Sequence, residues 1–137
     1  MKKTTDELLS ELSRSPLSGF LNENESELSD GELSKYLSEL LKEKNMSRAE
    51  VIRRSGIFDV YGYEIFSGKK HPSRDNVIRL IFGFPLELSE AQKLLKYSFY
   101  APLYPRNKRD AVIISYLGKS ITDLNLELDS LGLSPIL

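Results

Sequence analysis

The chain lacks cysteine and tryptophan altogether, and its 137 residues include a single histidine, His71. Without cysteine there are no disulfide bonds, thiolate metal sites or cysteine nucleophiles. One imidazole and no thiolate leave no cluster of side chains that would hold a zinc ion. We therefore expect neither a metal nor another cofactor.

Long apolar stretches are also missing, and no run approaches the roughly 18 residues that a membrane span needs. The polar residues Thr4 to Glu7 stand where a secretory signal would need an apolar segment. These absences predict a soluble, cytoplasmic protein that makes no membrane contact.

The formal net charge of −1 conceals an uneven distribution along the chain. Residues 1–45 contain ten acids and six bases, whereas residues 46–110 contain twelve bases and seven acids. A basic stretch inside a neutral chain can mark a surface that faces phosphates. Ordinary solvated helix faces would give the same modest excess, so the charge alone favours that simpler interpretation.

Residues 1–30 are rich in serine, glutamate and asparagine, and residues 13–30 show no sustained helical period. We expect a flexible, acidic and polar N-terminal tail over 1–30, in which a short helix could begin near Thr5. Its leucines, Leu8, Leu9 and Leu12, would suit a peptide that docks on a partner. The usual behaviour of chain termini favours a loosely attached arm instead.

From Gly31 onward the pattern predicts a helical domain over 31–137, with a core motif at 31–84 and a C-terminal extension at 85–137. A first helix at about 32–44 follows from an apolar stripe at helical spacing, formed by Leu33, Tyr36, Leu37, Leu40 and Leu41. Ser47 opens a capping box for a second helix, which Gly56 ends. A third helix is expected over 59–67 and ends at Gly68. Ser73 caps a fourth helix, whose inward residues are Val77, Leu80 and Ile81.

In the extension, residues 89–92 form another capping box, which predicts a helix with Leu94 and Leu95 inside. Two prolines in the aromatic segment 97–105 end this helix and delay the next, and the rings are expected to cover the core edge. Further helices are expected at about 108–117 and from Ser120, as N-cap, to Gly132. Because no segment alternates apolar and polar residues, the predicted fold class is all-α.

Two short helices joined by a tight glycine turn are the skeleton of a helix-turn-helix. The segment from Leu33 to about Phe84 resembles the lambda-repressor-like helix-turn-helix family, often called the XRE family, beyond that skeleton. The matching elements occur in the family's order, namely the cap Ser47, the small residue Ala49, the turn Gly56–Ile57, the inward-facing Ile65 and the segment Gly68–Ser73. The resemblance implies a helix-turn-helix bundle, to which the helices after Phe84 add a C-terminal subdomain.

DNA-binding members of the family place the start of the third helix in the major groove and hold phosphates with backbone amides and nearby side chains. The resemblance implies that the residues facing the bases are Phe58, Asp59, Tyr61, Gly62 and Tyr63. Arg48 stands where the family often carries a phosphate-binding glutamine, and the residues flanking the DNA backbone would be Lys69, Lys70 and Arg74. A left-handed conformation is expected at Gly56, because a β-carbon would disfavour it.

The third helix departs from what direct readout favours, because residues 59–67 contain no Arg, Lys, Asn or Gln. Asp59 and Glu64 would approach phosphates at an electrostatic cost, unless Asp59 serves only as the helix N-cap. Gly62 costs about 1 kcal/mol relative to alanine inside a helix, which suggests close approach by another group. Since tyrosine is common at protein interfaces, an exposed contact face for a protein is the alternative, formed by Phe58, Tyr61 and Tyr63 with Tyr104 nearby.

Enzyme functions have little support, because His71 lies in a predicted turn and the glycines at 56 and 62 do not match a phosphate-binding loop. Two binding functions remain. The first is a transcriptional regulator that binds double-stranded DNA, and the second is a protein–protein interaction module on a helix-turn-helix scaffold that does not read DNA. The sequence leaves homodimerisation open.

Overall fold

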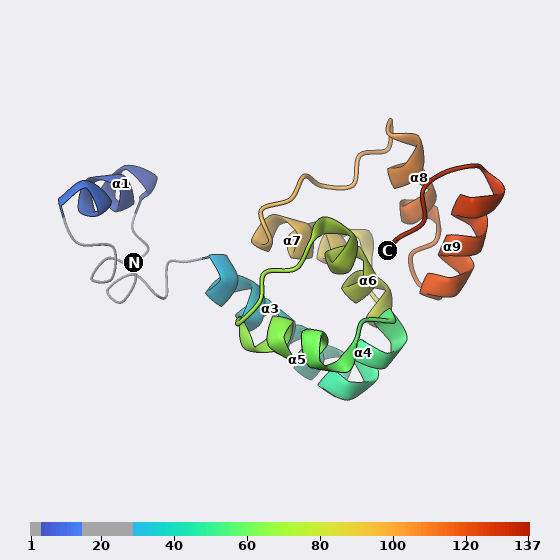
Figure 1. Cartoon of the computed structure of the whole chain (residues 1–137), viewed down its shortest axis with the longest axis horizontal. Coiled ribbons are helices and arrows are strands. Elements are labelled where there is room, and N and C mark those ends of the chain that lie inside the picture. Colours follow the sequence, from blue (N-terminus) through green and yellow to red (C-terminus); the bar gives the residue numbers. More distant parts are fainter. Residues whose placement is uncertain (1–3, 15–28) are drawn as a thin grey trace.

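The computed structural model describes residues 4–14 and 29–137, and this part of the chain forms eight helices and no strand. The predicted all-α class is confirmed for these residues. In chain order the helices are α1 (Thr5–Arg14), α3 (Ser29–Lys44), α4 (Arg48–Ser55), α5 (Asp59–Ser67), α6 (Arg74–Gly83), α7 (Leu88–Tyr97), α8 (Lys108–Ser115) and α9 (Ile121–Ser130), as Figure 1 shows. None of the helices described is long and apolar enough to cross a bilayer.

The predicted tail at 1–30 falls largely on residues 1–3 and 15–28, which lie outside the described residues. Helix α1 begins at Thr5, where the sequence suggested a helix start. Its first turn is capped reciprocally: the Glu7 amide donates to Thr4 Oγ1 at 3.1 Å and the Thr4 amide donates to Glu7 Oε2 at 3.4 Å. Helix α3 begins at Ser29, so it starts three residues earlier than predicted and inside the predicted tail.

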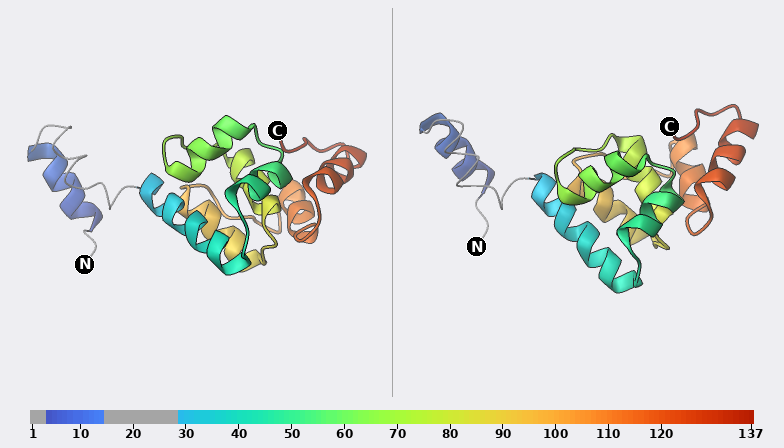
Figure 2. Two further views of the ribbon diagram at one scale, coloured as in Figure 1. Left: turned by 90° about the horizontal axis from the view of Figure 1, so that it is seen from below. Right: turned by 60° about the horizontal axis from the view of Figure 1, so that its bottom comes forward.

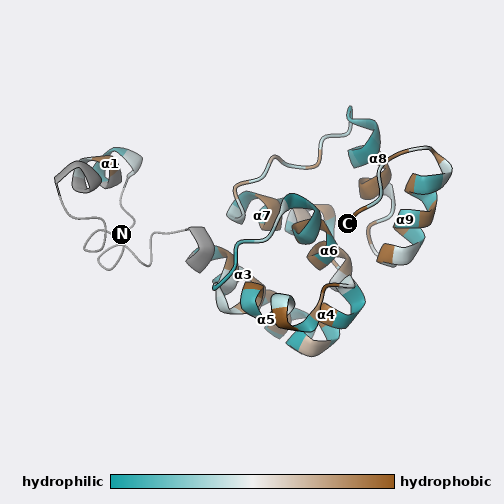
Figure 3. Cartoon of the chain, viewed as in Figure 1, coloured by the Kyte–Doolittle hydropathy of each residue, from teal (hydrophilic) through white to brown (hydrophobic). Residues whose placement is uncertain are grey.

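One continuous apolar core joins helices α3 to α9. The predicted stripe on α3 faces this core, with Leu37 and Leu40 completely buried and Leu41 half-buried at its edge. The inward residues predicted for α6 and α7 are also buried, namely Val77, Leu80, Ile81, Leu94 and Leu95. Hydrophobic segments turn toward the interior in Figure 3, while hydrophilic ones cover the outside. Burial of this core is the main source of the fold's stability.

Helices α4 and α6 cross at close range. A β-carbon on Gly83 would lie 2.6 Å from the Val51 carbonyl oxygen, a contact that real side chains do not make. Glycine at this position therefore sets how closely the two helices approach.

The α3–α7 contact combines aromatic packing with an ion pair. The rings of Tyr36 and Tyr97 pack at a centroid distance of 5.1 Å, and Lys44 Nζ lies 3.0 Å from Glu90 Oε2. Burial raises the pKa of Tyr36 to about 12, with a further contribution from the charge of Glu90. Burial also acts to raise the pKa of Glu90, but the hydrogen bond from the Glu87 amide and the contact with Lys44 outweigh it and lower that pKa.

Three serine caps predicted from the sequence are confirmed. Ser47, Ser73 and Ser120 each accept a hydrogen bond from the amide three residues later, at 3.1, 3.2 and 3.1 Å. The capping box predicted at Ser89 is wrong. Helix α7 begins at Leu88, and the Glu87 amide donates instead to Glu90 at 3.0 Å. Leu86, buried directly ahead of this cap, directs the chain into the helix earlier than expected.

Helices α8 and α9 lie together at one end of the domain, as Figures 1 and 2 show. The chain then turns back, and Ile136 is completely buried. Its amide donates to Asn125 Oδ1 at 2.7 Å, which attaches the C-terminal segment to α9.

The aromatic segment 97–105 covers the core edge only in part. Tyr97 and Tyr100 pack against the core, and the Tyr100 hydroxyl donates to the Pro72 carbonyl at 2.7 Å. Phe99 and Tyr104, by contrast, are 78% and 56% exposed.

Candidate nucleic-acid interface

Helices α4 and α5 are joined by a tight turn at Gly56. This glycine has φ +74°, the left-handed conformation that the sequence predicts. A β-carbon there would also approach Arg79 Nη1 to 2.8 Å. Ile57, the next residue, is buried, so the turn is anchored to the core before α5 begins. A second left-handed glycine, Gly68, ends α5 as predicted.

Arg79 on α6 holds the end of α4 from below the turn. Its Nη1 donates to the Ser55 carbonyl at 3.1 Å, and its Nη2 donates to the Ile136 carbonyl at 2.7 Å. The guanidinium therefore connects the α4–α5 turn to the C-terminal segment. Arg79 is not among the residues predicted from the sequence, because nothing local marks its partners.

Gly62 is placed differently from the sequence prediction, which set it among the residues facing a ligand. It is buried, and a β-carbon would come within 2.8 Å of Ile52 Cγ1 and Cγ2. The close approach that the sequence suggested is therefore internal, between α5 and α4. Gly62 makes this crossing possible and is not part of a contact surface.

The solvent-facing side of α5, here called the α5 face, carries both apolar and acidic side chains. It comprises Phe58, Asp59, Val60, Tyr63, Glu64 and Ser67. Phe58 is 89% exposed, Val60 74% and Tyr63 40%. Val60 was missed at the sequence level, although its spacing of three residues from Tyr63 places both on one helical side.

Two further residues of α5 depart from prediction. Tyr61 was expected to be exposed, but it is half-buried and packs against the core. Asp59 was considered as the N-cap, but α5 begins at Asp59 itself and the capping position belongs to Phe58, which makes no side-chain cap bond. The buried Ile57 fixes the chain one residue ahead of the cap, so the helix starts without a polar side chain at that position. The Asp59 carboxylate is therefore left on the exposed surface, in the first turn of the helix.

Arg48, at the start of α4, lies beside the α5 face. Its guanidinium carbon is 5.5 Å from the centre of the Tyr63 ring, which is cation–π distance. A surface pocket of about 450 Å³ opens between the two helices, lined by Ala49, Ile52, Arg53, Gly56, Ile57, Asp59 and Tyr63. Ala49, the small residue of the predicted motif, is itself exposed at this pocket.

Lys69 and Lys70 follow α5 directly and are both exposed. Their amides donate to the Glu64 carbonyl at 2.9 and 3.2 Å, so the backbone of this turn is held against the helix end. Lys69 Nζ lies 3.9 Å from Glu64 Oε2, a loose surface ion pair. His71 is exposed in the turn that follows, as expected from the sequence.

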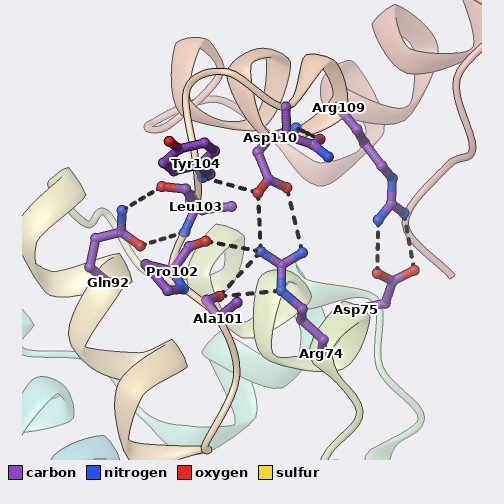
Figure 4. Close-up of polar contacts among 10 residues, drawn as sticks. Arg74, Asp75, Gln92, Ala101, Pro102, Leu103, Tyr104, Arg109 and Asp110 are labelled. Atoms are coloured by element: carbon purple, nitrogen blue, oxygen red, sulfur yellow. Dashed lines mark hydrogen bonds and ion pairs between the residues drawn. The ribbon is translucent and has the colours of Figure 1, made fainter.

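Arg74 does not belong to this surface, contrary to the sequence prediction. Its Nη2 lies 3.2 Å from Asp110 Oδ2 on α8, and its guanidinium also donates to the carbonyls of Ala101 and Pro102 (Figure 4). The neighbouring pair Arg109–Asp75 makes two hydrogen bonds of 3.1 Å. Arg74 is thus occupied in joining α6 to α8, because its partners lie on the segment that the sequence could not place.

Tyr104 lies apart from the α5 face, although the sequence prediction placed the two close together. It belongs to the segment between α7 and α8, and Figure 1 shows this segment and α5 on different sides of the domain. Its amide donates to Asp110 Oδ2 at 3.0 Å, within the cluster that holds Arg74. The candidate interface thus consists of the α5 face, the neighbouring cations of α4, and Lys69 and Lys70.

Among the residues described, no group of three or more His, Asp or Glu side chains could hold a metal ion. No family model, curated protein or solved structure matches the chain. Function must therefore be argued from the residues of this chain and their arrangement.

Proposed function

We propose that this protein is a DNA-binding regulator of the helix-turn-helix type, in which the α5 face enters the major groove and neighbouring cations contact phosphates. The observation that supports this proposal is the position of the exposed cations. Arg48 lies beside Tyr63 in the middle of α5, and Lys69 and Lys70 follow its C-terminal end. A helix inserted into the groove would have the two phosphate backbones on these sides.

The charge balance of residues 47–70 also favours a polyanion. This segment contains five bases and three acids. Two of the acids are already paired within it, Glu50 with Arg54 at 3.8 Å and Glu64 with Lys69 at 3.9 Å. Phosphate contacts of this kind give affinity that is largely independent of sequence.

A protein partner is the second candidate, and the exposure of Phe58 and Val60 favours it. Large apolar side chains that are 89% and 74% exposed, next to a tyrosine, are typical of residues at the centre of protein interfaces. On this alternative the cations would meet acidic groups of the partner, and the protein would bind no duplex.

Binding to duplex DNA can be tested with the full chain and the double variant Lys69→Ala, Lys70→Ala. We expect the wild-type chain to shift mixed-sequence duplexes at low salt. The double variant should weaken binding about equally on all sequences and reduce the slope of log K against log salt by roughly one to two units, since two phosphates are no longer neutralised. The slope is measured by titrations at several salt concentrations.

The matched control is the double variant Arg106→Ala, Lys108→Ala, which removes the same charge from exposed positions near the start of α8. Because these residues lie at the other end of the domain from α5 (Figure 1), the salt slope should stay unchanged. Equal effects of the two double variants would show that only total charge matters and would contradict the proposed interface. Absence of any shift at low salt would reject DNA binding and favour the protein partner.

A further inference from the structure

The α5 face carries none of the side chains that form two hydrogen bonds with a base edge. Arg and Lys with guanine, and Asn and Gln with adenine, are the common specific pairs in the major groove. Residues 58–67 contain none of these four types. A helix without them still discriminates bases if its surface matches other features of the groove.

Two kinds of group are available on the α5 face. Phe58 and Val60 offer exposed apolar surface. Asp59 offers exposed carboxylate oxygens, which only accept hydrogen bonds. The other carboxylate, that of Glu64, is less exposed and faces Lys69, so Asp59 is the acceptor that a base edge would meet.

The base edges of the major groove differ in how they suit these groups. Thymine alone presents an apolar group there, its C5-methyl, whereas guanine presents two acceptors, N7 and O6. Apolar side chains match the methyl group. A carboxylate opposite the guanine acceptors would be repelled, but it can accept from the amino groups of cytosine or adenine.

Resting on the DNA-binding function proposed above, we infer that the α5 face selects duplexes by their thymine methyl groups, with Phe58 and Val60 as the specificity-determining residues. Asp59 disfavours guanine at the position it faces. The preferred target is therefore rich in A·T pairs, and it is recognised through methyl contacts in place of hydrogen-bonding forks.

The test uses the full chain and a library of random-sequence duplexes made with thymidine triphosphate. Duplexes that bind at low salt are selected and sequenced, and thymine should be enriched at fixed positions. The selected duplexes are then resynthesised with deoxyuridine in place of thymidine, which removes the C5-methyl group and leaves the base sequence and pairing unchanged. Affinity should fall about fourfold for each thymine methyl that the α5 face buries, as expected for burial of one methylene-sized group.

Two variants assign this effect to the side chains. The double variant Phe58→Ala, Val60→Ala should keep its melting temperature and its low-salt binding but bind thymidine and deoxyuridine duplexes equally. The control Leu126→Ala removes an exposed apolar side chain of α9, 65% exposed, and should retain the preference for thymidine.

Three results would overturn the inference while leaving DNA binding intact. They are selection without thymine enrichment, equal wild-type affinity for the two duplexes, and a thymidine preference that persists in the double variant and hence arises from the duplex itself. Failure to bind any duplex at low salt would instead reject the proposed function together with this inference.

Discussion

Within α5, neighbouring residues have opposite roles. Gly62 faces Ile52 so closely that a side chain would not fit, and Tyr61 packs on the core beside it. Phe58 and Val60 point to solvent. Because each helical residue turns the side chain by about 100°, adjacent positions separate into a packing side and a contact side.

Replacing Phe58 or Tyr61 by alanine should separate these roles. Phe58→Ala removes an exposed ring and should change the free energy of unfolding by no more than about 0.5 kcal/mol. Tyr61→Ala removes a half-buried ring and should destabilise the domain by about 2 kcal/mol, roughly half the loss for a fully buried aromatic. Urea denaturation of both variants measures the difference. Equal stability of the two would show that Tyr61 makes no structural contribution.

At the scale of elements, the orientation of α5 depends on contacts that α5 does not make itself. The end of α4 is held by Arg79, whose guanidinium reaches both the Ser55 carbonyl and the Ile136 carbonyl. The C-terminal segment thereby supports the turn from which α5 leaves. A helix presented to a ligand needs this kind of fixed support, because small displacements weaken every contact at once.

The substitution Arg79→Met tests the bridge, since it keeps much of the side chain's length and removes both donors. The Ser55 carbonyl loses its donor in the process, so we expect a loss of about 1–3 kcal/mol in unfolding free energy. Amide hydrogen exchange should become faster at residues 56–58 and 133–137 in the same variant. The control Arg53→Met alters an exposed arginine of α4 and should leave stability and exchange near wild-type values. Faster exchange in only one of the two segments would contradict their coupling through Arg79.

For the whole molecule, the main question is how α8 and α9 are attached to the rest of the domain. Two arginine–aspartate pairs cross between α6 and α8, Arg74 with Asp110 and Arg109 with Asp75 (Figure 4). The Asp110 side chain is only 9% exposed and that of Arg74 27%. Pairs at this depth are screened less by solvent than surface pairs, so loss of one partner is expensive.

Asp110→Asn should therefore destabilise the whole domain. The amide oxygen can still accept from the Tyr104 amide, so the change isolates the loss of charge opposite Arg74. We expect a decrease of about 2 kcal/mol in unfolding free energy, between the values for exposed and fully buried pairs. The measurement is the urea midpoint at constant m-value, with Asp129→Asn on the exposed side of α9 as control. A loss no larger than that of the control would mean that the pair does not hold α8 in place.

Much of the local structure could be predicted from the sequence. The bounds of α5, the serine caps and the left-handed turn at Gly56 depend on hydrogen bonds and backbone preferences within a few residues. Apolar periodicity likewise identified the buried sides of α3 and α6. The exposed cations Arg48, Lys69 and Lys70 were also named correctly as surface residues, because they stand at helix ends.

Tertiary structure alone decided which residues of the predicted site remain available to a ligand. Arg74 is occupied by a residue 36 positions away, and Arg79 is tied to Ile136 across 57 positions. No local pattern encodes such partners, since the free energy of these contacts depends on how the helices are packed. The same packing assigns Gly62 and Tyr61 to the interior and leaves Phe58 and Val60 outside. The sequence by itself thus determined where the helices lie along the chain, whereas packing determined which side of α5 faces solvent.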